Sequence, residues 1–438
     1  MKTRLIPLYF DPGRDEEFDR QVEVLRQLLA AEAELMPPVP LGSRLPDGDA
    51  VVLPQLLGAA YSRLSDFQAI SLPILIVTSE FGTVSMWDWE IISYLASAGV
   101  HTIAPTSPEE TSRACRAIAV RRKLMQSRFL VFQDNPGEGL QASIFKRFYW
   151  WEAECVQRMK AKFGVAITRK SYRELATEAK RVPDEKAREV LSAKRLTTAG
   201  TSEHADLAAV KLYLAARGAV EQEAGVIGAG ANCLNESHFS DSTPCLAWTL
   251  LFEELGLTWG CEADTVSMLT QYILYECLGT PVVMTNLYPF LMGEAALKHE
   301  RIPHFPPVSD PEHHVLLAHC GYLGLMPPCF ATEWTLRPKV LAIVGDDAIV
   351  VDARLQPGPV TLVKLGPTMD RITVGPAYLE GYVQYPGSDC LSGGVLRVQD
   401  GPRFVHSLPS HHCVVIPRHR LADIELLAAV FGLEVDIV

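Results

Sequence analysis

The first 150 residues alternate short apolar runs with segments whose apolar residues recur at helical spacing. Residues 3–10 (TRLIPLYF) are an apolar run typical of a strand, and residues 15–35 place apolar side chains three and four positions apart, as an amphipathic helix does. Further strands and helices are expected at 50–57, 72–79, 87–99, 100–106, 108–127 and 128–137. Strands that alternate with helices predict a parallel sheet covered on both faces. No GxGxxG follows the first expected strand, so a nicotinamide cofactor has no support here.

The middle of the chain predicts a helical region followed by a second α/β unit. Residues 145–225 are mainly helical in pattern, with a charged surface segment at 182–195. The second unit begins at 224–235 (AGVIGAGANCLN), and its further segments are expected at 243–256, 257–279, 280–290 and 313–324.

After about residue 335 the pattern changes to short apolar segments separated by Gly, Pro and Asp. These segments lie at 339–355, 358–366, 371–386, 393–399 and 411–417, and a helix at 420–432 and a strand at 433–438 follow. Short strands with turn signals between them predict a compact antiparallel barrel or sandwich. The fold class that we predict is therefore α/β, with two Rossmann-like α/β domains at 1–150 and 151–335 and an antiparallel β-barrel-like domain at 336–438.

Composition narrows the kinds of partner. The chain has 438 residues, which is too many for a single hydrophobic core. Hydrophobic residues make up 48% and charged residues 21%, the usual balance of a soluble globular protein. The net charge is −12 without a block of like charges, which argues against nucleic acid or an anionic membrane as the main partner. A small neutral ligand or self-association is compatible with it.

Features tied to cellular location favour the cytoplasm. The first residues reach acidic and turn residues too soon for a signal peptide, and no apolar run approaches the roughly 20 residues of a membrane helix. The ten cysteines are scattered and form no CxxC pair. We therefore expect reduced, mostly buried thiols in a cytoplasmic protein.

Two carboxylates follow a predicted strand in 258–270 (TWGCEADTVSMLT). Glu262 is expected at the strand end, where open α/β sheets bind ligands, and Gly260 and Cys261 leave little side chain around it. The alternative is an ordinary helix N-terminus, at which acidic side chains are favourable. Asp264 fits this alternative well.

Histidines provide the second candidate set. The dipeptide HH occurs twice, at 313–314 and at 411–412, and His319 follows an apolar run at another expected strand end. A histidine beside an apolar run is usually structural. Together with a strand-end carboxylate, however, His319, His411 and His412 resemble the mixed ligands of a divalent metal.

Other motifs are weaker. Gly228 and Gly230 could shape a phosphate nest but lack the lysine of a P-loop. Residues 85–90 (SMWDWE) and 148–152 (FYWWE) place aromatic residues beside acids, as sugar-binding surfaces do, although core or subunit-interface positions are commoner for such residues. No GxSxG or Cys–His signature supports nucleophilic catalysis.

Four stretches in the second half of the chain resemble the L-fucose isomerase and L-arabinose isomerase superfamily, in particular its fucose-isomerase-like members. They are 243–264 (TPCLAWTLLFEELGLTWGCEAD), 278–286 (LGTPVVMTN), 316–321 (LLAHCG) and 410–435 (SHHCVVIPRHRLADIELLAAVFGLEV), and they occur in the family's order. The resemblance implies two α/β domains and a β-barrel-like domain. It also implies aldose–ketose isomerisation through an enediol with a divalent metal, commonly manganese, in a trimer or hexamer whose active sites lie near subunit contacts.

The resemblance assigns expected roles to individual residues. Glu262 matches a glutamate that binds the metal and acts as acid and base. His412 matches a metal-binding histidine, with His411 as the fallback, and His319 matches a histidine that lines or binds the metal. Arg14 in YFDPGRDEEF matches an arginine near the substrate.

Asn286 departs from the family pattern. The family carries at this position a second acid that binds the metal and moves a proton, whereas an amide can donate an oxygen to a metal but cannot act as a base. Three explanations are open. Glu294, Asp310 or another acid takes the role, or the chain performs related chemistry with one carboxylate, or it binds a sugar-like ligand with little or no turnover.

The sequence therefore supports a leading hypothesis and two rivals. The leading hypothesis is a cytoplasmic, homo-oligomeric, carbohydrate isomerase-like protein that uses Mn²⁺ or another divalent metal on a small sugar or sugar derivative. Its rivals are a sugar-binding or regulatory paralogue with impaired catalysis, and an interaction module whose pocket is vestigial.

Overall fold

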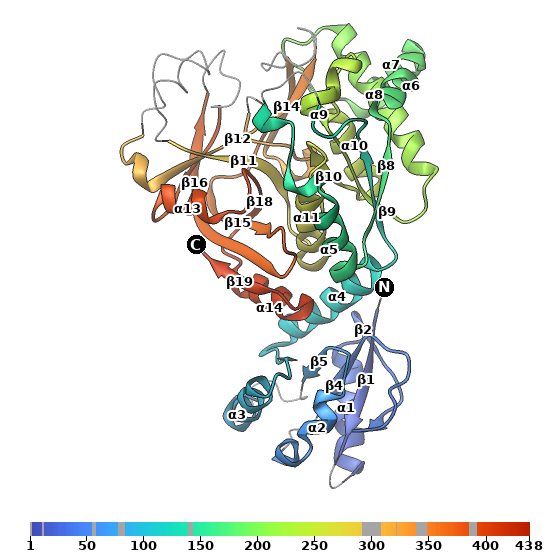
Figure 1. Cartoon of the computed structure of the whole chain (residues 1–438), viewed down its shortest axis with the longest axis vertical. Coiled ribbons are helices and arrows are strands. Elements are labelled where there is room, and N and C mark those ends of the chain that lie inside the picture. Colours follow the sequence, from blue (N-terminus) through green and yellow to red (C-terminus); the bar gives the residue numbers. More distant parts are fainter. Residues whose placement is uncertain are drawn as a thin grey trace. The chain divides into compact units, whose positions relative to one another are not determined.

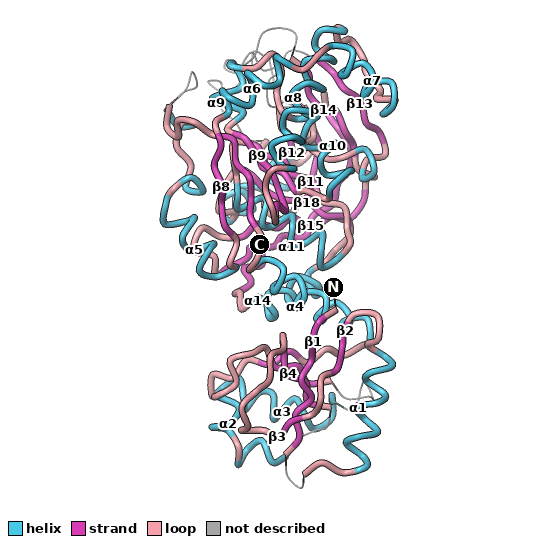
Figure 2. Tube along the Cα trace, turned by 90° about the vertical axis from the view of Figure 1, so that its right-hand side faces the viewer, coloured by secondary structure: helices cyan, strands magenta, loops and turns pink. Residues whose placement is uncertain are grey.

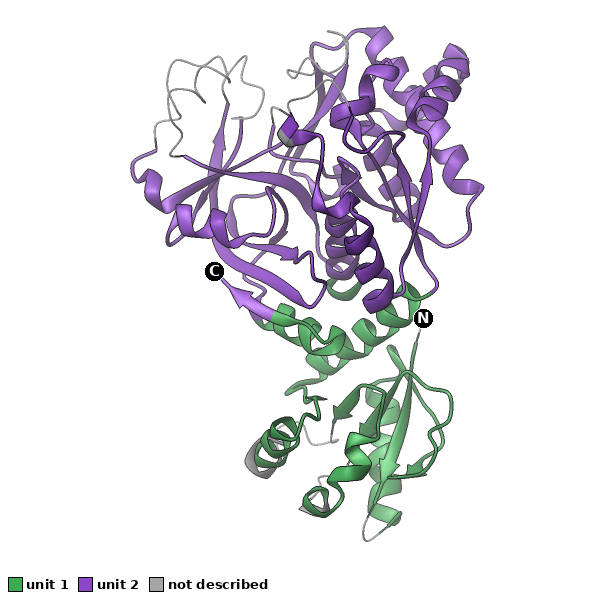
Figure 3. Cartoon of the chain, in the orientation of Figure 1, with its two compact units in different colours: residues 1–125, 276–278, 422–434 green, residues 126–275, 279–421, 435–438 purple. Residues whose placement is uncertain are grey.

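The computed structural model describes most of the chain, and its described residues form two compact units (Figure 3). The described residues are 2–10, 13–54, 58–77, 84–138, 143–290, 308–320, 322–338, 348–384 and 392–438. Unit 1 comprises residues 1–125, 276–278 and 422–434, and unit 2 comprises residues 126–275, 279–421 and 435–438. The predicted division at residues 150 and 335 stays a prediction.

Unit 1 is built on a parallel sheet with the order β2-β1-β4-β5-β6, to which β3 is added beside β1. Its strands are β1 Thr3–Tyr9, β2 Ala33–Leu35, β3 Val39–Pro40, β4 Ala50–Leu53, β5 Ile74–Ile76 and β6 Thr102–Ile103. Its helices are α1 Glu16–Leu28, α2 Leu64–Gln68, α3 Val84–Ser97, α4 Pro108–Leu124 and most of α14 Leu421–Phe431. This confirms the parallel α/β architecture that was predicted for the N-terminal residues.

The helix predicted over 15–35 is too long. Asp15 caps α1 by accepting a hydrogen bond from the backbone N–H of Phe18, as an N-terminal aspartate does. The helix ends at Leu28, and residues 33–35 form β2 instead, where Ala33 pairs in parallel with Thr3. Pairing with β1 therefore overrides the helical pattern of the last three residues.

Unit 2 contains a second parallel sheet, with the order β10-β9-β7-β8. Its strands are β7 Arg128–Phe132, β8 Ala166–Lys170, β9 Val226–Ala231 and β10 Thr258–Cys261. The helices of this part are α5 Ala153–Phe163, α6 Tyr172–Arg181, α7 Asp184–Lys194, α8 Glu203–Glu221, α9 Cys233–Glu236, α10 Cys245–Leu255 and α11 Thr265–Leu278. Residues 128–137 were predicted among the elements of the first 150 residues, but their strand β7 pairs with β8 and β9 of this second sheet.

The rest of unit 2 contains a closed barrel of six antiparallel strands. Its strands are β11 Val283–Pro289, β12 His314–Ala318, β15 Gly358–Leu365, β16 Arg371–Val383, β17 Gly393–Arg397 and β18 His412–Pro417. The order is β15-β18-β11-β12-β17-β16, and pairing of β16 with β15 closes the ring. Helix α13 Gly401–Ser407, the pair β13 Glu333–Pro338 and β14 Ile349–Arg354, and β19 Glu434–Ile437 complete the elements. Figure 2 shows β11, β18 and β15 running side by side.

Two barrel strands come from segments that were predicted for the second α/β unit. β11 and β12 pair antiparallel with each other, and β11 also pairs antiparallel with β18. Apolar runs at 280–290 and 313–324 indicate buried strands, but they do not reveal the direction of the partner strand. The β-barrel prediction is confirmed, although the barrel begins earlier in the chain than residue 336.

The end of the parallel sheet and the barrel meet at α11. Three residues separate the end of β10 from the start of this helix, which lies beside the barrel (Figure 1). The backbone N–H of Leu365, at the end of β15, donates a hydrogen bond to Thr270 Oγ1 on α11 at 3.3 Å. Among the described residues, no helix has the length and apolar character that crossing a membrane requires.

Candidate metal centre

Glu262 occupies a left-handed turn directly after β10. Its φ is 52° and that of Ala263 is 54°, a region that residues with a side chain rarely adopt. The Glu262 carbonyl oxygen accepts the indole N–H groups of Trp150 at 3.0 Å and Trp151 at 2.8 Å. The backbone N–H of Ala263 donates to the carbonyl of Ala231 at 2.7 Å. These bonds hold a strained turn, and strain of this kind concentrates at functional sites.

Small residues allow the strand before this turn to pack closely. A Cβ on Gly260 would lie 2.7 Å from Met268 Sδ and 2.9 Å from the Asp264 carbonyl oxygen. A Cβ on Gly230 would lie 2.6 Å from the Gly260 carbonyl oxygen. Gly228 and Gly230 both lie within β9, so their place is explained by close packing of strands rather than by a phosphate nest.

Asp264 caps α11, as expected of a helix N-terminus, but it does more than that. Its Oδ1 accepts the backbone N–H of Ser267 at 2.8 Å. Its Oδ2 accepts hydrogen bonds from Lys364 Nζ at 2.7 Å, Ser267 Oγ at 2.8 Å and His412 Nδ1 at 2.9 Å. The side chains of Asp264, Lys364 and His412 are all fully buried. Burial raises the pKa of Asp264, but Lys364 and the His412 hydrogen bond outweigh it and hold the pKa well below its usual value.

Three of the predicted ligands lie on neighbouring barrel strands. Asn286 on β11 pairs with His412 on β18, and on its other side it pairs with Ala318 on β12. His319 follows Ala318 directly. The rings of His319 and His412 are stacked with their centroids 6.1 Å apart. The register of the barrel therefore places Asn286, in the middle of β11, between His412 at the start of β18 and His319 just after the end of β12.

Glu262 meets the two C-terminal histidines. Its Oε2 lies 3.5 Å from His411 Nε2 and 3.7 Å from His412 Nε2. One ligand atom from each of these three residues can be chosen so that all lie within 4.8 Å of one another. The His411 side chain is 30% exposed, whereas that of His412 is fully buried. The cluster combines one carboxylate with imidazoles, a donor set that divalent transition metals accept.

Four buried atoms at this place have no hydrogen-bond partner in the described structure. They are Glu262 Oε2, Asn286 Oδ1, His319 Nε2 and His412 Nε2. Asn286 Nδ2 lies 3.0 Å from Tyr288 Oη, so the amide oxygen is the atom left over. An unsatisfied buried polar group costs about 1–3 kcal/mol. Each of the four atoms can offer a lone pair to a cation when it carries no proton, so the residues fit a divalent metal.

Neighbouring groups give Glu262 and His412 the protonation that a metal requires, but not His319. Burial lowers the pKa of His319, but Cys320 outweighs it and the pKa rises to about 9. Burial, with a further contribution from His411, lowers the pKa of His412 to about 4. Burial raises the pKa of Glu262, but His412 and His411 outweigh it and the net direction is downward. A neutral imidazole and an ionised carboxylate at neutral pH are the forms that bind metals.

Aromatic side chains of residues 148–151 surround the cluster. The Trp150 ring stacks on His412, with centroids 5.2 Å apart at an interplanar angle of 29°. The Phe148 ring lies 5.5 Å from that of His411 and stacks on Trp150 at 4.4 Å. Trp150 and Trp151 are buried. The segment that the sequence suggested as a sugar-binding surface or a core element thus lines the candidate metal centre.

The other predicted site residue belongs to a different unit. Arg14 lies in unit 1, and its Nε donates to Asp19 Oδ1 at 2.6 Å, with 49% of the Arg14 side chain exposed. Its contact with a substrate stays a prediction.

Of the two alternative acids, Asp310 does not join the cluster in the described residues. Asp310 precedes the 3-10 turn Pro311–His313 and therefore the first residue of β12, His314. Since Asn286 pairs with Ala318 at the last residue of β12, Asp310 lies beyond the opposite end of that strand. Glu294 lies outside the described residues.

Sequence reasoning missed Lys364 as part of the site, and it suggested Trp150 and Trp151 only as a sugar-binding surface or core element, not as partners of Glu262. The signal for Lys364 was present, because it is the one charged residue of the apolar strand 358–365 (GPVTLVKL). A lysine within a buried strand needs a partner acid. For the tryptophans the local sequence held no such signal, because their partner is a backbone carbonyl more than a hundred residues away.

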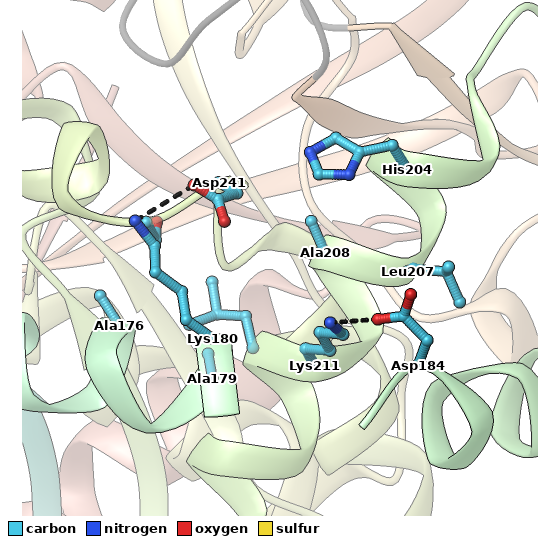
Figure 4. Close-up of a pocket in the computed structure, with 11 residues that line it drawn as sticks. Ala176, Ala179, Lys180, Asp184, His204, Leu207, Ala208, Lys211 and Asp241 are labelled. Carbon is cyan, nitrogen blue, oxygen red and sulfur yellow. Dashed lines mark ion pairs between the residues drawn. The ribbon is translucent and has the colours of Figure 1, made fainter. Parts of the chain in front are cut away.

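A separate pocket lies on the helical part of unit 2 (Figure 4). It is lined by residues of α6, α7 and α8 and by the segment around Asp241. Its two lysines are already paired, Lys180 with Asp241 at 3.2 Å and Lys211 with Asp184 at 2.5 Å. None of the predicted site residues lines it, so the candidate centre is the cluster around Glu262.

Comparison with known proteins does not assign the chain to a family. No protein-family model matches the chain, and a search of curated proteins finds no relative of significant similarity.

Proposed function

We propose that this chain is a metal-dependent carbohydrate isomerase-like protein, which interconverts the aldose and ketose forms of a small sugar or sugar derivative through an enediol. The observation that carries the proposal is the cluster of Glu262, His411 and His412, whose ligand atoms lie within 4.8 Å of one another. Unpartnered polar atoms of Asn286 and His319 lie on the neighbouring strand and at the end of the next one. Glu262 comes from the end of a parallel sheet and the other four from the barrel strands and their ends. Cytoplasmic location and a homo-oligomer, trimer or hexamer, are part of the same proposal.

Glu262, His412, His319 and Asn286 would hold the metal, Mn²⁺ or another divalent ion, with His411 as a further ligand. A bound divalent metal stabilises the negative charge that develops on two neighbouring sugar oxygens during isomerisation. The oxygen atoms of the carboxylate and the amide and the nitrogen atoms of the imidazoles are all suitable ligands for such an ion.

Two side chains of the cluster would transfer the protons that isomerisation requires. Glu262 Oε2 would take a proton from one sugar carbon and return it to the neighbouring carbon. Asn286 has no proton to exchange, so the second group able to carry one is His411, whose Nε2 lies 3.5 Å from Glu262 Oε2 and which is partly exposed. Trp150 and Trp151 would hold the Glu262 turn and exclude water from its inner side.

A second candidate is a sugar-binding or regulatory protein with impaired catalysis. Asn286 favours it, since the amide replaces the acid expected from the resemblance and removes one negative charge from the cation site. A vestigial pocket in an interaction module is the third possibility.

The decisive experiment measures metal and turnover together. We expect purified chain to retain Mn²⁺ after dialysis and to convert one of a panel of aldoses into its ketose. Glu262→Gln should abolish turnover and weaken Mn²⁺ binding at least tenfold. Tyr61→Phe, a surface change in unit 1, serves as the matched control and should change neither. Protein without Mn²⁺ affinity, combined with turnover that survives Glu262→Gln, would overturn the enzyme proposal, and metal-independent sugar binding would favour the second candidate.

A further inference from the structure

The two ring nitrogens of His412 have opposite surroundings. Nδ1 lies 2.9 Å from Asp264 Oδ2, whereas Nε2 has no hydrogen-bond partner among the described residues and faces Glu262 Oε2 at 3.7 Å. Only one nitrogen of a neutral imidazole carries a proton, and a hydrogen bond at one nitrogen fixes which. The partner at Nδ1 therefore decides whether Nε2 has a free lone pair.

Asp264 can only accept at this position. Its other contacts are all donors: the Ser267 backbone N–H reaches Oδ1, while Lys364 Nζ and Ser267 Oγ reach Oδ2. Lys364 Nζ also donates to Ser267 Oγ at 2.5 Å, which leaves the serine hydroxyl proton directed at the carboxylate. A carboxylate surrounded in this way is an acceptor, so His412 Nδ1 is the donor.

Lys364 explains how a carboxylate is kept in this buried place. An unpaired charge without solvent is very unfavourable, and Lys364 is fully buried with its ammonium 2.7 Å from Asp264. Its Nζ also lies 5.7 Å from the centroid of the Trp150 ring that stacks on His412. The Asp264–Lys364 pair is electrically neutral, so Glu262 supplies the negative charge of the cluster itself.

We infer that Asp264 and Lys364 are positioning residues, which hold His412 as the Nδ1–H tautomer and so present the Nε2 lone pair to the metal beside Glu262. The inference rests on the proposed metal centre, but its geometric part concerns the proton on His412 alone. Carboxylate partners of this kind orient metal-binding histidines and raise their basicity. Here the partner comes from the N-cap of α11, and its counter-ion comes from β15, two strands away from β11.

The test is a variant that reverses the donor at Nδ1 without leaving a buried charge. In Asp264→Asn combined with Lys364→Met, the asparagine oxygen keeps the Ser267 N–H and its amide NH₂ then faces Nδ1. We expect His412 to change to the Nε2–H tautomer, and the Mn²⁺ affinity to fall about 10–100-fold. The tautomer is read by long-range proton–nitrogen NMR on protein with isotope-labelled histidine, in which His412→Gln identifies the signal.

Thr270→Val is the matched control, because it removes another buried hydrogen bond between α11 and β15 and leaves Asp264 intact. It should keep the Nδ1–H tautomer and an Mn²⁺ affinity within threefold of the wild type. An Nε2–H tautomer in the wild type overturns the inference, even if the double variant does not fold. Unchanged tautomer or affinity in the folded double variant overturns it too, as does an equal loss of affinity in Thr270→Val. Wild-type protein that has the Nδ1–H tautomer but binds no Mn²⁺ would instead refute the proposed metal centre.

Discussion

Asn286 lies directly opposite His412 across the antiparallel strands β11 and β18. The amide that stands in the place of an expected acid is therefore a cross-strand neighbour of the buried imidazole, and its Oδ1 is one of the unpartnered atoms. The position is suited to a metal ligand, and the residue type determines what that ligand can do.

Asn286→Asp should strengthen metal binding. The change adds one negative charge within an almost isosteric side chain, and a unit charge about 4 Å away is worth up to about 4 kcal/mol near a protein surface. We expect the Mn²⁺ dissociation constant, measured by calorimetry, to fall at least tenfold, and isomerase turnover to appear or rise. Asn235→Asp, at a buried asparagine on α9, is the control and should leave Mn²⁺ affinity unchanged. Equal Mn²⁺ affinity in Asn286→Asp and wild type would exclude Asn286 from the centre.

Replacing the tryptophans should release the Glu262 turn. Trp150→Phe and Trp151→Phe each remove one buried hydrogen bond to the Glu262 carbonyl, so the free energy of unfolding should fall by about 1–2 kcal/mol for each. Mn²⁺ affinity should fall as well, because two consecutive left-handed residues then lose part of their support. The comparison is Trp248→Phe, an equally buried tryptophan whose indole nitrogen has no partner in the described structure. Denaturant unfolding that shows the same loss for all three variants would attribute the effect to volume alone.

Gly260→Ala should destabilise unit 2. Its new Cβ would lie 2.9 Å from the backbone oxygen of Asp264, which cannot rotate away, so we expect a loss of about 1–3 kcal/mol in the free energy of unfolding. Gly218 in α8 provides the opposite case, since nothing lies within 4 Å of a Cβ built there. Gly218→Ala should raise stability by about 0.5–1 kcal/mol, because alanine is the better helix former. Thermal unfolding of both variants measures the contrast, and a neutral Gly260→Ala would show that β10 and α11 separate easily.

Acid should weaken unit 1 through Asp49. Burial raises the pKa of this carboxyl, but hydrogen bonds from Arg4 and Arg122 outweigh it, so the pKa is lowered in the folded protein. A lowered pKa means that the stabilisation is complete above the unfolded value, about 3.9 for aspartate, and is lost as the pH falls towards the folded value. Asp49→Asn should therefore reduce stability at neutral pH and flatten its decline below about pH 4. Hydrogen exchange of β1 and β4 peptides across this pH range measures it, with exposed Asp47→Asn as the control. Parallel pH profiles for wild type and Asp49→Asn would contradict the assignment.

Local pattern was sufficient for some of these features and insufficient for others. The strand-end position of Glu262 and the helix cap at Asp264 follow from an apolar run, two small residues and an acid, all within a few positions. The approach of His412 to Asn286 depends on pairing between strands more than a hundred residues apart, and no local pattern contains that register. For the same reason β7 was predicted as a strand but placed in the wrong sheet, and β11 and β12 were predicted with the wrong neighbours. Lys364 lies between these two cases. A lysine in an apolar strand indicates that a buried acid lies beside it, but the sequence does not indicate that this acid is Asp264.

The position of β18 in the ring also has a consequence for biosynthesis. β18 lies between β15 and β11, so the barrel stays open along both of those edges until residue 417 has left the ribosome. Glu262 and Asn286 are translated well before His412, and domains generally fold as they emerge, N-terminal parts first. The nascent chain therefore carries Glu262, Asn286 and His319, three of the four proposed metal ligands, before His412 is available. A stalled chain that ends before residue 411 should expose β11 as an unpaired edge. We expect such a chain to bind chaperones and not to bind manganese.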